Sequence, residues 1–156
     1  NSHFVHVPYN TFATKTDLIV LALVGDRFWP ALLDVVDDDE LRTSRFLSAP
    51  ARLAEKAYIE KRITTKFVNQ DADYWLQKLE LAHIPCARVN NISQAMQDPQ
   101  VLARDMIVDV AHPIAGSVKV PGNPIKLSDT NGESYTPPPL LGADTEGVLR
   151  DWLGDS

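Results

Sequence analysis

Cysteine is nearly absent from this chain, since Cys86 is the only one among 156 residues. A single thiol excludes an internal disulfide, and it excludes a zinc site built from several cysteines of one chain. This composition is typical of a protein from a reducing compartment, so we expect a cytoplasmic location.

Long apolar runs are lacking as well. The longest strongly apolar stretch, LIVLALV at residues 18–24, is about a third of the roughly 20 residues that a membrane-spanning helix needs. The chain also opens without the basic start, apolar middle and small-residue cleavage site of a signal peptide. We therefore expect no membrane partner.

The first residue, Asn1, is not a methionine and a strand follows almost at once, which indicates an excised piece of a longer protein.

A surplus of positive charge is missing too. Lys and Arg number 15 against 21 Asp and Glu, which gives a net charge of −6, and the basic residues are scattered along the chain. Proteins that bind nucleic acids gather such residues into a patch or stripe that contacts the phosphates. The sequence therefore predicts no nucleic-acid partner.

The apolar content is sufficient for a core, with 44% hydrophobic and 23% charged residues. The stretch YNTFATKTDLIVLALV, residues 9–24, predicts a hairpin whose second strand is buried. A strand-to-helix turn follows at Gly25, and Asp26 is expected to cap the next helix. That helix has apolar residues at helical spacing, namely Phe28, Trp29, Leu32, Leu33 and Val36.

Two longer helices are expected in the middle of the chain. One runs from about residue 50 to 68 with a broad apolar arc, and a second begins at the N-cap Asp71. The segment IPCARV then reads as a short strand, Ser93 opens a brief helix, and DPQVLAR has the cap-then-proline start of another.

The last third predicts a hairpin, an arm and a helix. MIVDVAHP and SVKVPGNPIKLS flank the turn at 115–116, DTNGESYTPPP at 129–139 is a proline-rich arm, and helical spacing resumes after a cap at Asp144 or Thr145. The predicted fold class is therefore α+β. A small antiparallel sheet packs with several helices, and a C-terminal hairpin, a proline-rich arm and a terminal helix complete it.

Candidate reactive groups are few. Cys86 lies in an apolar strand, without the base, cation or helix N-terminus that activates a thiol, and is interpreted as structural. His3 and His6 have a spacing that could join them at a metal, but the segment around them reads as extended. The acidic run at 37–40 lacks the ligand pattern of a calcium loop and suits the start of a helix. We therefore assign no catalytic residue and no metal site.

The order of several motifs carries more information than any single residue. Residues 8–36 resemble the strand, turn, strand and Trp-bearing helix that open the small domain of the class III coenzyme A-transferases. IPCARV, DPQVLAR and HPIAGSVKVPGNPIKLS follow at the family's spacing, and PPPLLGADTEGVL is similar to its closing motif. The family includes formyl-CoA and carnitine CoA-transferases and 2-methylacyl-CoA racemases.

This resemblance implies an activity and a missing half. In the family, an aspartate of the large N-terminal domain attacks an acyl-CoA thioester, and CoA passes to a carboxylate acceptor. Nothing in residues 1–156 matches the segment with that aspartate, so the chain alone is expected to be inactive. Coenzyme A or acyl-CoA would be a substrate, with no permanently bound cofactor.

The resemblance also implies an assembly. Family members form interlocked homodimers, so we expect a homodimer here. Residues 1–128 would be the small domain, and residues 129–156 an arm and helix that return to the large domain.

In the family, the turn after the second strand faces the acyl end of the site. The resemblance therefore implies substrate binding by Val24, Gly25, Asp26 and Trp29. From the residues alone, Trp29 could equally be a core side chain and Asp26 only a helix cap.

Three alternatives to a transferase half stay open. One is a non-catalytic acyl-CoA-binding or dimer-assembly module, the second is a structural remnant without a ligand, and the third is part of an acyl-CoA racemase. Gly25 stands near where the racemase branch has an acid, which favours a transferase. The chain departs from the family at Ala143 and Asp144, where a Glu-His pair is usual, and at Arg88, which replaces a proline.

Overall fold

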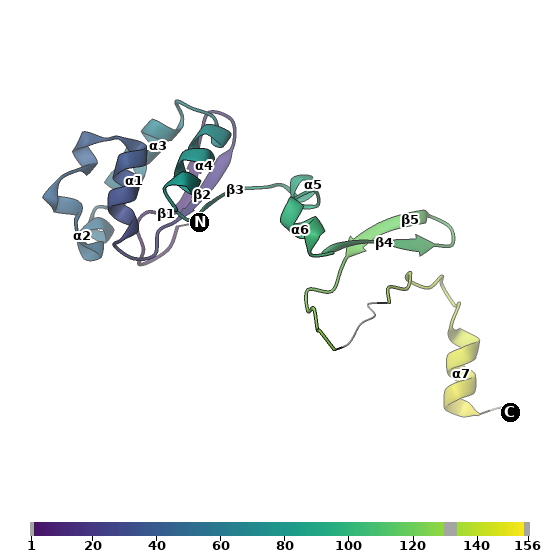
Figure 1. Ribbon diagram of the computed structural model, residues 1–156. Coiled ribbons are helices and arrows are strands. Elements are labelled where there is room, and N and C mark those ends of the chain that lie inside the picture. Colours follow the sequence, from purple (N-terminus) through teal and green to yellow (C-terminus); the bar gives the residue numbers. More distant parts are fainter. Residues whose placement is uncertain (1, 130–133, 155–156) are drawn as a thin grey trace. The chain divides into compact units, whose positions relative to one another are not determined.

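The computed structural model describes residues 2–129 and 134–154, and contacts divide the chain into two compact units (Figure 1). The first unit comprises residues 1–90 and the second residues 91–156. The division lies within the segment 1–128 that was expected to be one domain. Each unit is described below by itself.

A three-stranded antiparallel sheet forms the centre of the first unit. Its strands are β1 (Tyr9–Ala13), β2 (Leu18–Ala22) and β3 (Cys86–Arg88), in the order β1-β2-β3. The hairpin predicted at residues 9–24 is confirmed, and the Thr14 hydroxyl closes its turn by donating to the Asp17 carbonyl at 2.7 Å. The middle strand is the most buried, with Ile19 and Leu21 fully covered.

Helices pack on this sheet and on one another. They are α1 (Phe28–Val36), the short 3-10 turns η1 (Asp39–Leu41) and η2 (Ser44–Phe46), α2 (Ala49–Ala54), α3 (Lys56–Phe67) and α4 (Ala72–Leu81). Helix α3 contacts β1, α4 contacts β2 and β3, and α1 contacts both α3 and α4. Asp71 caps α4 as predicted, because its carboxylate accepts the Tyr74 amide at 2.9 Å.

The single long helix expected from about residue 50 to 68 is wrong in one respect. It breaks at Glu55, whose φ of −112° and ψ of 23° depart from helical geometry, so α2 and α3 are separate helices. The break lets each helix bury a different face. Helix α2 buries Arg52, and α3 buries Ile59, Ile63 and Phe67.

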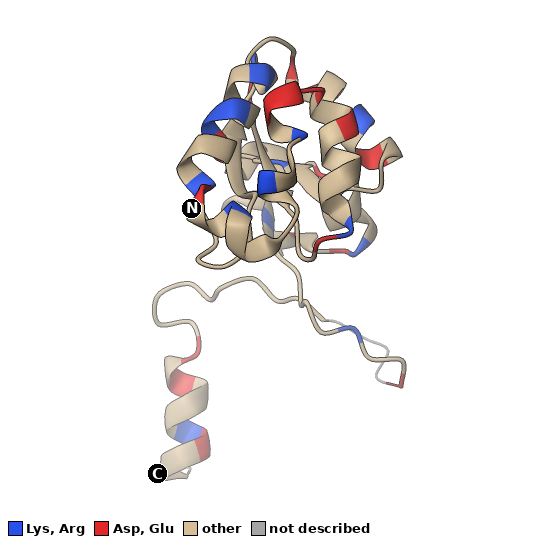
Figure 2. Ribbon diagram, turned by 90° about the vertical axis from the view of Figure 1, so that its left-hand side faces the viewer, with Lys and Arg blue, Asp and Glu red and all other residues tan. Residues whose placement is uncertain are grey.

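The core of the first unit is one apolar cluster with aromatic contacts at its centre. Phe67 packs against Trp75 with ring centroids 4.6 Å apart and meets Phe12 edge-on at 5.8 Å. Figure 2 shows acidic and basic residues interspersed over the helices of this unit. Charges of both signs are therefore mixed on the helices seen in this view.

The second unit contains α5 (Ile92–Ala95), α6 (Pro99–Ala103), the antiparallel pair β4 (Ile107–His112) and β5 (Gly116–Pro121), and α7 (Thr145–Leu153). The second predicted hairpin is thus confirmed. Asn91 rather than Ser93 caps the brief helix, in a reciprocal pair of hydrogen bonds with Gln94. Asp98 caps α6 as predicted.

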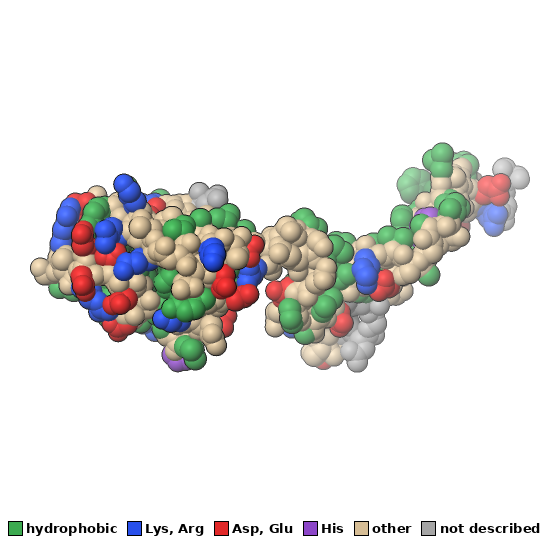
Figure 3. All heavy atoms as spheres, turned by 90° about the horizontal axis from the view of Figure 1, so that it is seen from above, with side chains coloured by type: hydrophobic (Ala, Val, Ile, Leu, Met, Phe, Trp, Pro, Cys, Tyr) green, Lys and Arg blue, Asp and Glu red, His purple; other side chains and the backbone are tan. Residues whose placement is uncertain are grey.

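The second unit buries little apolar surface. Among its described residues, Val110 is the one hydrophobic side chain that is buried. Figure 3 shows hydrophobic side chains on its surface, and the most exposed include Ile92, Ile114, Leu141, Trp152 and Leu153. The predicted arm at 129–139 lies partly outside the described residues, and its described part, residues 134–139, contains no helix or strand.

The predicted fold class, α+β with a small antiparallel sheet, several helices and a C-terminal hairpin, is confirmed, and the hairpin forms a two-stranded sheet of its own. In the part of the chain that the structure describes, no helix is long and apolar enough to cross a bilayer.

Candidate functional site

The turn between β2 and α1 is open to solvent. Gly25 adopts a φ of +99°, which favours glycine, and a side chain placed there would meet no atom within 4 Å. Val24 is 52% exposed, although it continues the apolar run of β2. The turn therefore presents backbone and an apolar side chain to any ligand that reaches it.

Trp29 follows this turn in the first turn of α1, and it is part of the core. It is 2% exposed, and the Arg52 guanidinium lies 5.1 Å from the centroid of its ring. Among the described residues, its indole Nε1 is buried and finds no hydrogen-bond acceptor. Trp29 can therefore support the turn from inside.

Asp26 is not the helix cap that the sequence suggested. The N-cap position of α1 is Arg27, and no side chain caps that helix end. The Asp26 carboxylate instead forms an ion pair with Arg52, while its backbone carbonyl accepts the Trp29 amide at 3.1 Å. The physical reason is that a buried guanidinium offers a charged hydrogen bond, which is stronger than a bond to a backbone amide.

Arg52 is the central residue of this site, and sequence reasoning missed it. Its side chain is buried, and its Nε donates to the Val7 carbonyl at 3.1 Å. Its Nη1 donates to the carbonyls of Phe46 and Leu47 at 3.0 and 3.1 Å. The sequence around it, PARLAE, has no feature that separates a buried arginine from an exposed one.

The four residues predicted to bind substrate therefore fall into two groups. Val24, Gly25 and Asp26 lie on the exposed turn, whereas Trp29 is buried below it. Asp26 and Trp29 both contact Arg52, so the structure joins them through a residue from α2. The arrangement suits the binding and orientation of a ligand rather than bond making, because the guanidinium already pairs with the carboxylate.

Cys86 begins β3 and pairs with Leu21 of β2. Burial, and secondly the negative charge of Glu80, raise the pKa of its thiol above the ordinary value. A raised pKa keeps the sulfur protonated at neutral pH, so this group is a poor nucleophile. The structure is consistent with the structural interpretation of this cysteine.

The acidic run at 37–40 contains one buried carboxylate. Asp38 accepts two hydrogen bonds from Arg62, at 3.0 and 2.8 Å, and a third from the Glu40 amide at 3.0 Å. Burial acts to raise its pKa, but the bonds from Arg62 and Glu40 outweigh it, so the net shift is downward. Asp38 caps η1 and pairs with Arg62 of α3, and Asp39 and Glu40 lie in the first turn of η1. The run therefore begins a helix, as interpreted from the sequence.

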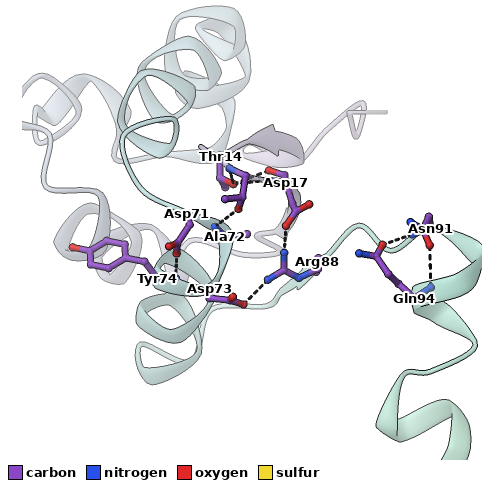
Figure 4. A network of polar contacts seen from close by, with 10 residues as sticks. Thr14, Asp17, Asp71, Ala72, Asp73, Tyr74, Arg88, Asn91 and Gln94 are labelled. Carbon is purple, nitrogen blue, oxygen red and sulfur yellow. Dashed lines mark hydrogen bonds and ion pairs between the residues drawn. The ribbon is translucent and has the colours of Figure 1, made fainter.

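A second polar network joins the hairpin turn to α4 (Figure 4). Arg88, at the end of β3, forms ion pairs with Asp17 of the hairpin turn and Asp73 of α4. This departure from the family pattern thus serves to connect three elements of the first unit.

No group of three or more His, Cys, Asp or Glu side chains that could hold a metal occurs among residues 2–129 and 134–154. His3 and His6 do lie together, with ring centroids 4.7 Å apart, but His3 Nδ1 accepts the backbone amides of Val5 and His6.

Comparison with known proteins identifies the family. Residues 1–145 match the model of CoA-transferase family III. The chain is 28% identical over 153 residues to a human succinyl-CoA:glutarate CoA-transferase, which covers 97% of this chain and 35% of the relative. It is 33% identical over 129 residues to a formyl-CoA:oxalate CoA-transferase of Rhodopseudomonas palustris, covering 82% and 30% respectively.

A solved structure agrees with the fold. A CAIB/BAIF family protein from Brucella suis superposes with a TM-score of 0.79 at 22% identity, covering 97% of this chain and 39% of that one. The chain belongs to CoA-transferase family III. It spans about a third of the length of the curated relatives described above.

Proposed function

We propose that this chain is the small-domain part of a CoA-transferase that moves coenzyme A from an acyl-CoA to a carboxylate acceptor. The observation that carries this proposal is the family match, which extends over residues 1–145. The relatives named above are transferases of succinyl-CoA or formyl-CoA with dicarboxylate acceptors. Their names favour transfer over racemisation, and they favour acyl-CoA and a carboxylate as substrates. We propose in addition that no cofactor is permanently bound.

The proposed chemistry needs a group from outside this chain. The family resemblance implies an aspartate nucleophile from a large domain, which splits one difficult transfer into easier steps. The chain alone is therefore proposed to be inactive. Residues 1–128 would act as the small domain, residues 129–156 would return to the large domain, and the assembly would be a cytoplasmic homodimer.

Within this assembly, the turn after β2 would contact the acyl end of the thioester. Val24, Gly25 and Asp26 would touch the ligand directly, and Trp29 would support them from below. The openness of the turn supports this, because a ligand could approach the backbone at Gly25 without displacing a side chain.

A non-catalytic assembly module is the second candidate, and the exposed apolar face of the second unit favours it. On α7, Val148 and Leu149 are half exposed, and Trp152 is 84% exposed. A truncation after Ser128 should abolish dimerisation if the arm and α7 hold two chains together. A truncated chain that still elutes as a dimer would contradict the module.

One titration tests the main proposal. Isotopically labelled chain is titrated with free CoA and then with acetyl-CoA, and the amide shifts are followed. We expect shifts at residues 24–29 with acetyl-CoA, together with no transfer of CoA to glutarate by the chain alone. Shifts confined to other residues, or none, would contradict the assignment of the turn, and turnover by the isolated chain would contradict the need for a second domain.

A further inference from the structure

Arg52 has a more constrained position than the other arginines that form ion pairs in the first unit. Its side chain is 4% exposed, compared with 58% for Arg45, which pairs with Glu55 nearby. Three of its hydrogen bonds go to backbone carbonyls, from the segment before β1 and from the end of η2. The guanidinium is therefore fixed by the scaffold whether or not Asp26 is bound to it.

Asp26 is the opposite case, since 60% of its side chain is exposed. Two backbone hydrogen bonds flank the turn that contains Asp26. Before the turn, the Leu23 amide donates to the Pro8 carbonyl. After it, the Trp29 amide donates to the Asp26 carbonyl. Between these two points, a Cβ placed on Gly25 would meet no atom within 4 Å. The ion pair thus ties an exposed turn to an immobile donor.

Such a tie restricts the turn efficiently. An exposed ion pair must order two long side chains, and this entropy cost cancels much of its attraction. Here the arginine is already ordered, so only the short aspartate side chain must be held. The direction of the guanidinium then determines where the backbone of the turn lies.

We propose that Arg52 is a positioning residue that holds the β2–α1 turn, through Asp26, in the conformation that receives the acyl end of the thioester. This inference rests on the function proposed above. Arg52 itself touches no substrate. Its effect on acyl-CoA binding passes through the carboxylate of Asp26 and the ring of Trp29.

The test compares two substitutions with a matched control in the whole 156-residue chain. Asp26→Asn keeps the shape of the side chain and leaves the three hydrogen bonds from Arg52 to backbone carbonyls intact. Arg52→Lys keeps the positive charge but loses the planar guanidinium with its several donors. Glu55→Gln is the control, because it breaks the exposed ion pair between Glu55, at the junction of α2 and α3, and Arg45 of η2, and changes neither Asp26 nor Arg52. Nitrogen-15 relaxation of the Gly25 and Asp26 amides is measured without ligand, and acetyl-CoA is then titrated.

In both variants we expect the order parameters of these two amides to fall from about 0.85, typical of rigid backbone, to below about 0.6. We expect acetyl-CoA to bind the variants about tenfold more weakly, while Asp26→Asn unfolds at nearly the wild-type temperature and Glu55→Gln matches wild type throughout. A purely structural role for the pair would lower the unfolding temperature without this local mobility.

Unchanged order parameters in Asp26→Asn would overturn the proposal. The relaxation measurement needs no ligand, so its result stands apart from the function. If wild type showed no acetyl-CoA shifts while the variants gained mobility, the substrate assignment would fail and Arg52 would still position the turn.

Discussion

Asp26 and Arg52 form an ion pair across 26 positions of sequence, and the two side chains differ sharply in exposure, at 60% and 4%. The arginine belongs to the interior and the aspartate to the surface. Because the interior partner also binds three carbonyls, removing the arginine and removing the aspartate should have unequal effects on stability.

Arg52→Met should destabilise the first unit far more than Asp26→Asn. The methionine leaves the carbonyls of Val7, Phe46 and Leu47 without their donor, and each buried unsatisfied group costs about 1–3 kcal/mol. Asp26→Asn removes one partly exposed ion pair, a loss of about 1 kcal/mol or less. Urea unfolding followed by tryptophan fluorescence measures both, and equal losses would contradict the role of the three carbonyls.

Asp38 should make stability depend on pH in the acidic range. Burial alone would raise the pKa of this carboxyl, but hydrogen bonds from Arg62 and the Glu40 amide outweigh burial, so its pKa in the folded protein lies below the ordinary value of an aspartate. The stabilisation is therefore fully present above the unfolded pKa of about 3.9, and it is lost as pH falls through the folded pKa.

Comparison with Asp38→Asn isolates this contribution. The variant should be less stable at pH 7, by about 3 kcal/mol as expected for breaking a buried pair. Its stability should fall less steeply than that of wild type below about pH 4. Parallel pH profiles for the two proteins would show that Asp38 does not titrate with a shifted pKa.

Cys86 should react slowly with thiol reagents in the folded chain. Burial, with a smaller effect of Glu80, raises its pKa, so less thiolate is present at neutral pH than for a free cysteine. Alkylation by iodoacetamide at pH 7.5, measured by mass spectrometry, should be at least about tenfold slower than alkylation of glutathione. The rate should approach that of glutathione in urea, and a fast reaction in the native chain would contradict the structural role.

Two glycines of the second unit should respond oppositely to alanine. A Cβ at Gly122 would lie 2.1 Å from the Asp105 carbonyl oxygen, so Gly122→Ala must distort the base of the hairpin. Gly147 lies inside α7, and a Cβ there would meet open space. Gly147→Ala should therefore stabilise the helix by up to about 1 kcal/mol of free energy. Amide hydrogen exchange of β4 and of α7 tests both substitutions. Unchanged exchange in β4 after Gly122→Ala, or faster exchange in α7 after Gly147→Ala, would contradict these expectations.

Local signals in the sequence were sufficient for much of the fold. Both hairpins, the caps at Asp71 and Asp98, and the apolar stripe of α1 depend on residues within a few positions of one another, which periodicity and turn chemistry can identify. The strand-to-helix turn at Gly25 also follows from local pattern. These features could be read without knowledge of tertiary contacts.

The features that define the candidate site depend on distant contacts. Asp26 has the residue type and position of a helix cap, and only the arrival of Arg52 from α2 changes its partner. Likewise, no glycine or proline lies next to Glu55 to indicate that the helix breaks there. For the described residues of the second unit, the helices and the hairpin were predicted, but the pattern did not indicate how few of their side chains would be buried.

The described residues of the second unit bury almost no apolar side chain, and this has a thermodynamic consequence. The heat capacity change and the denaturant sensitivity of unfolding both grow with the apolar area that becomes exposed. Among the described residues, every buried hydrophobic side chain except Val110 belongs to the apolar cluster of residues 1–90. A calorimetric or urea transition of this chain should therefore have the size expected for a protein of about 90 residues. If a large domain covers residues 91–154, the transition should grow by much more than the added domain alone would contribute.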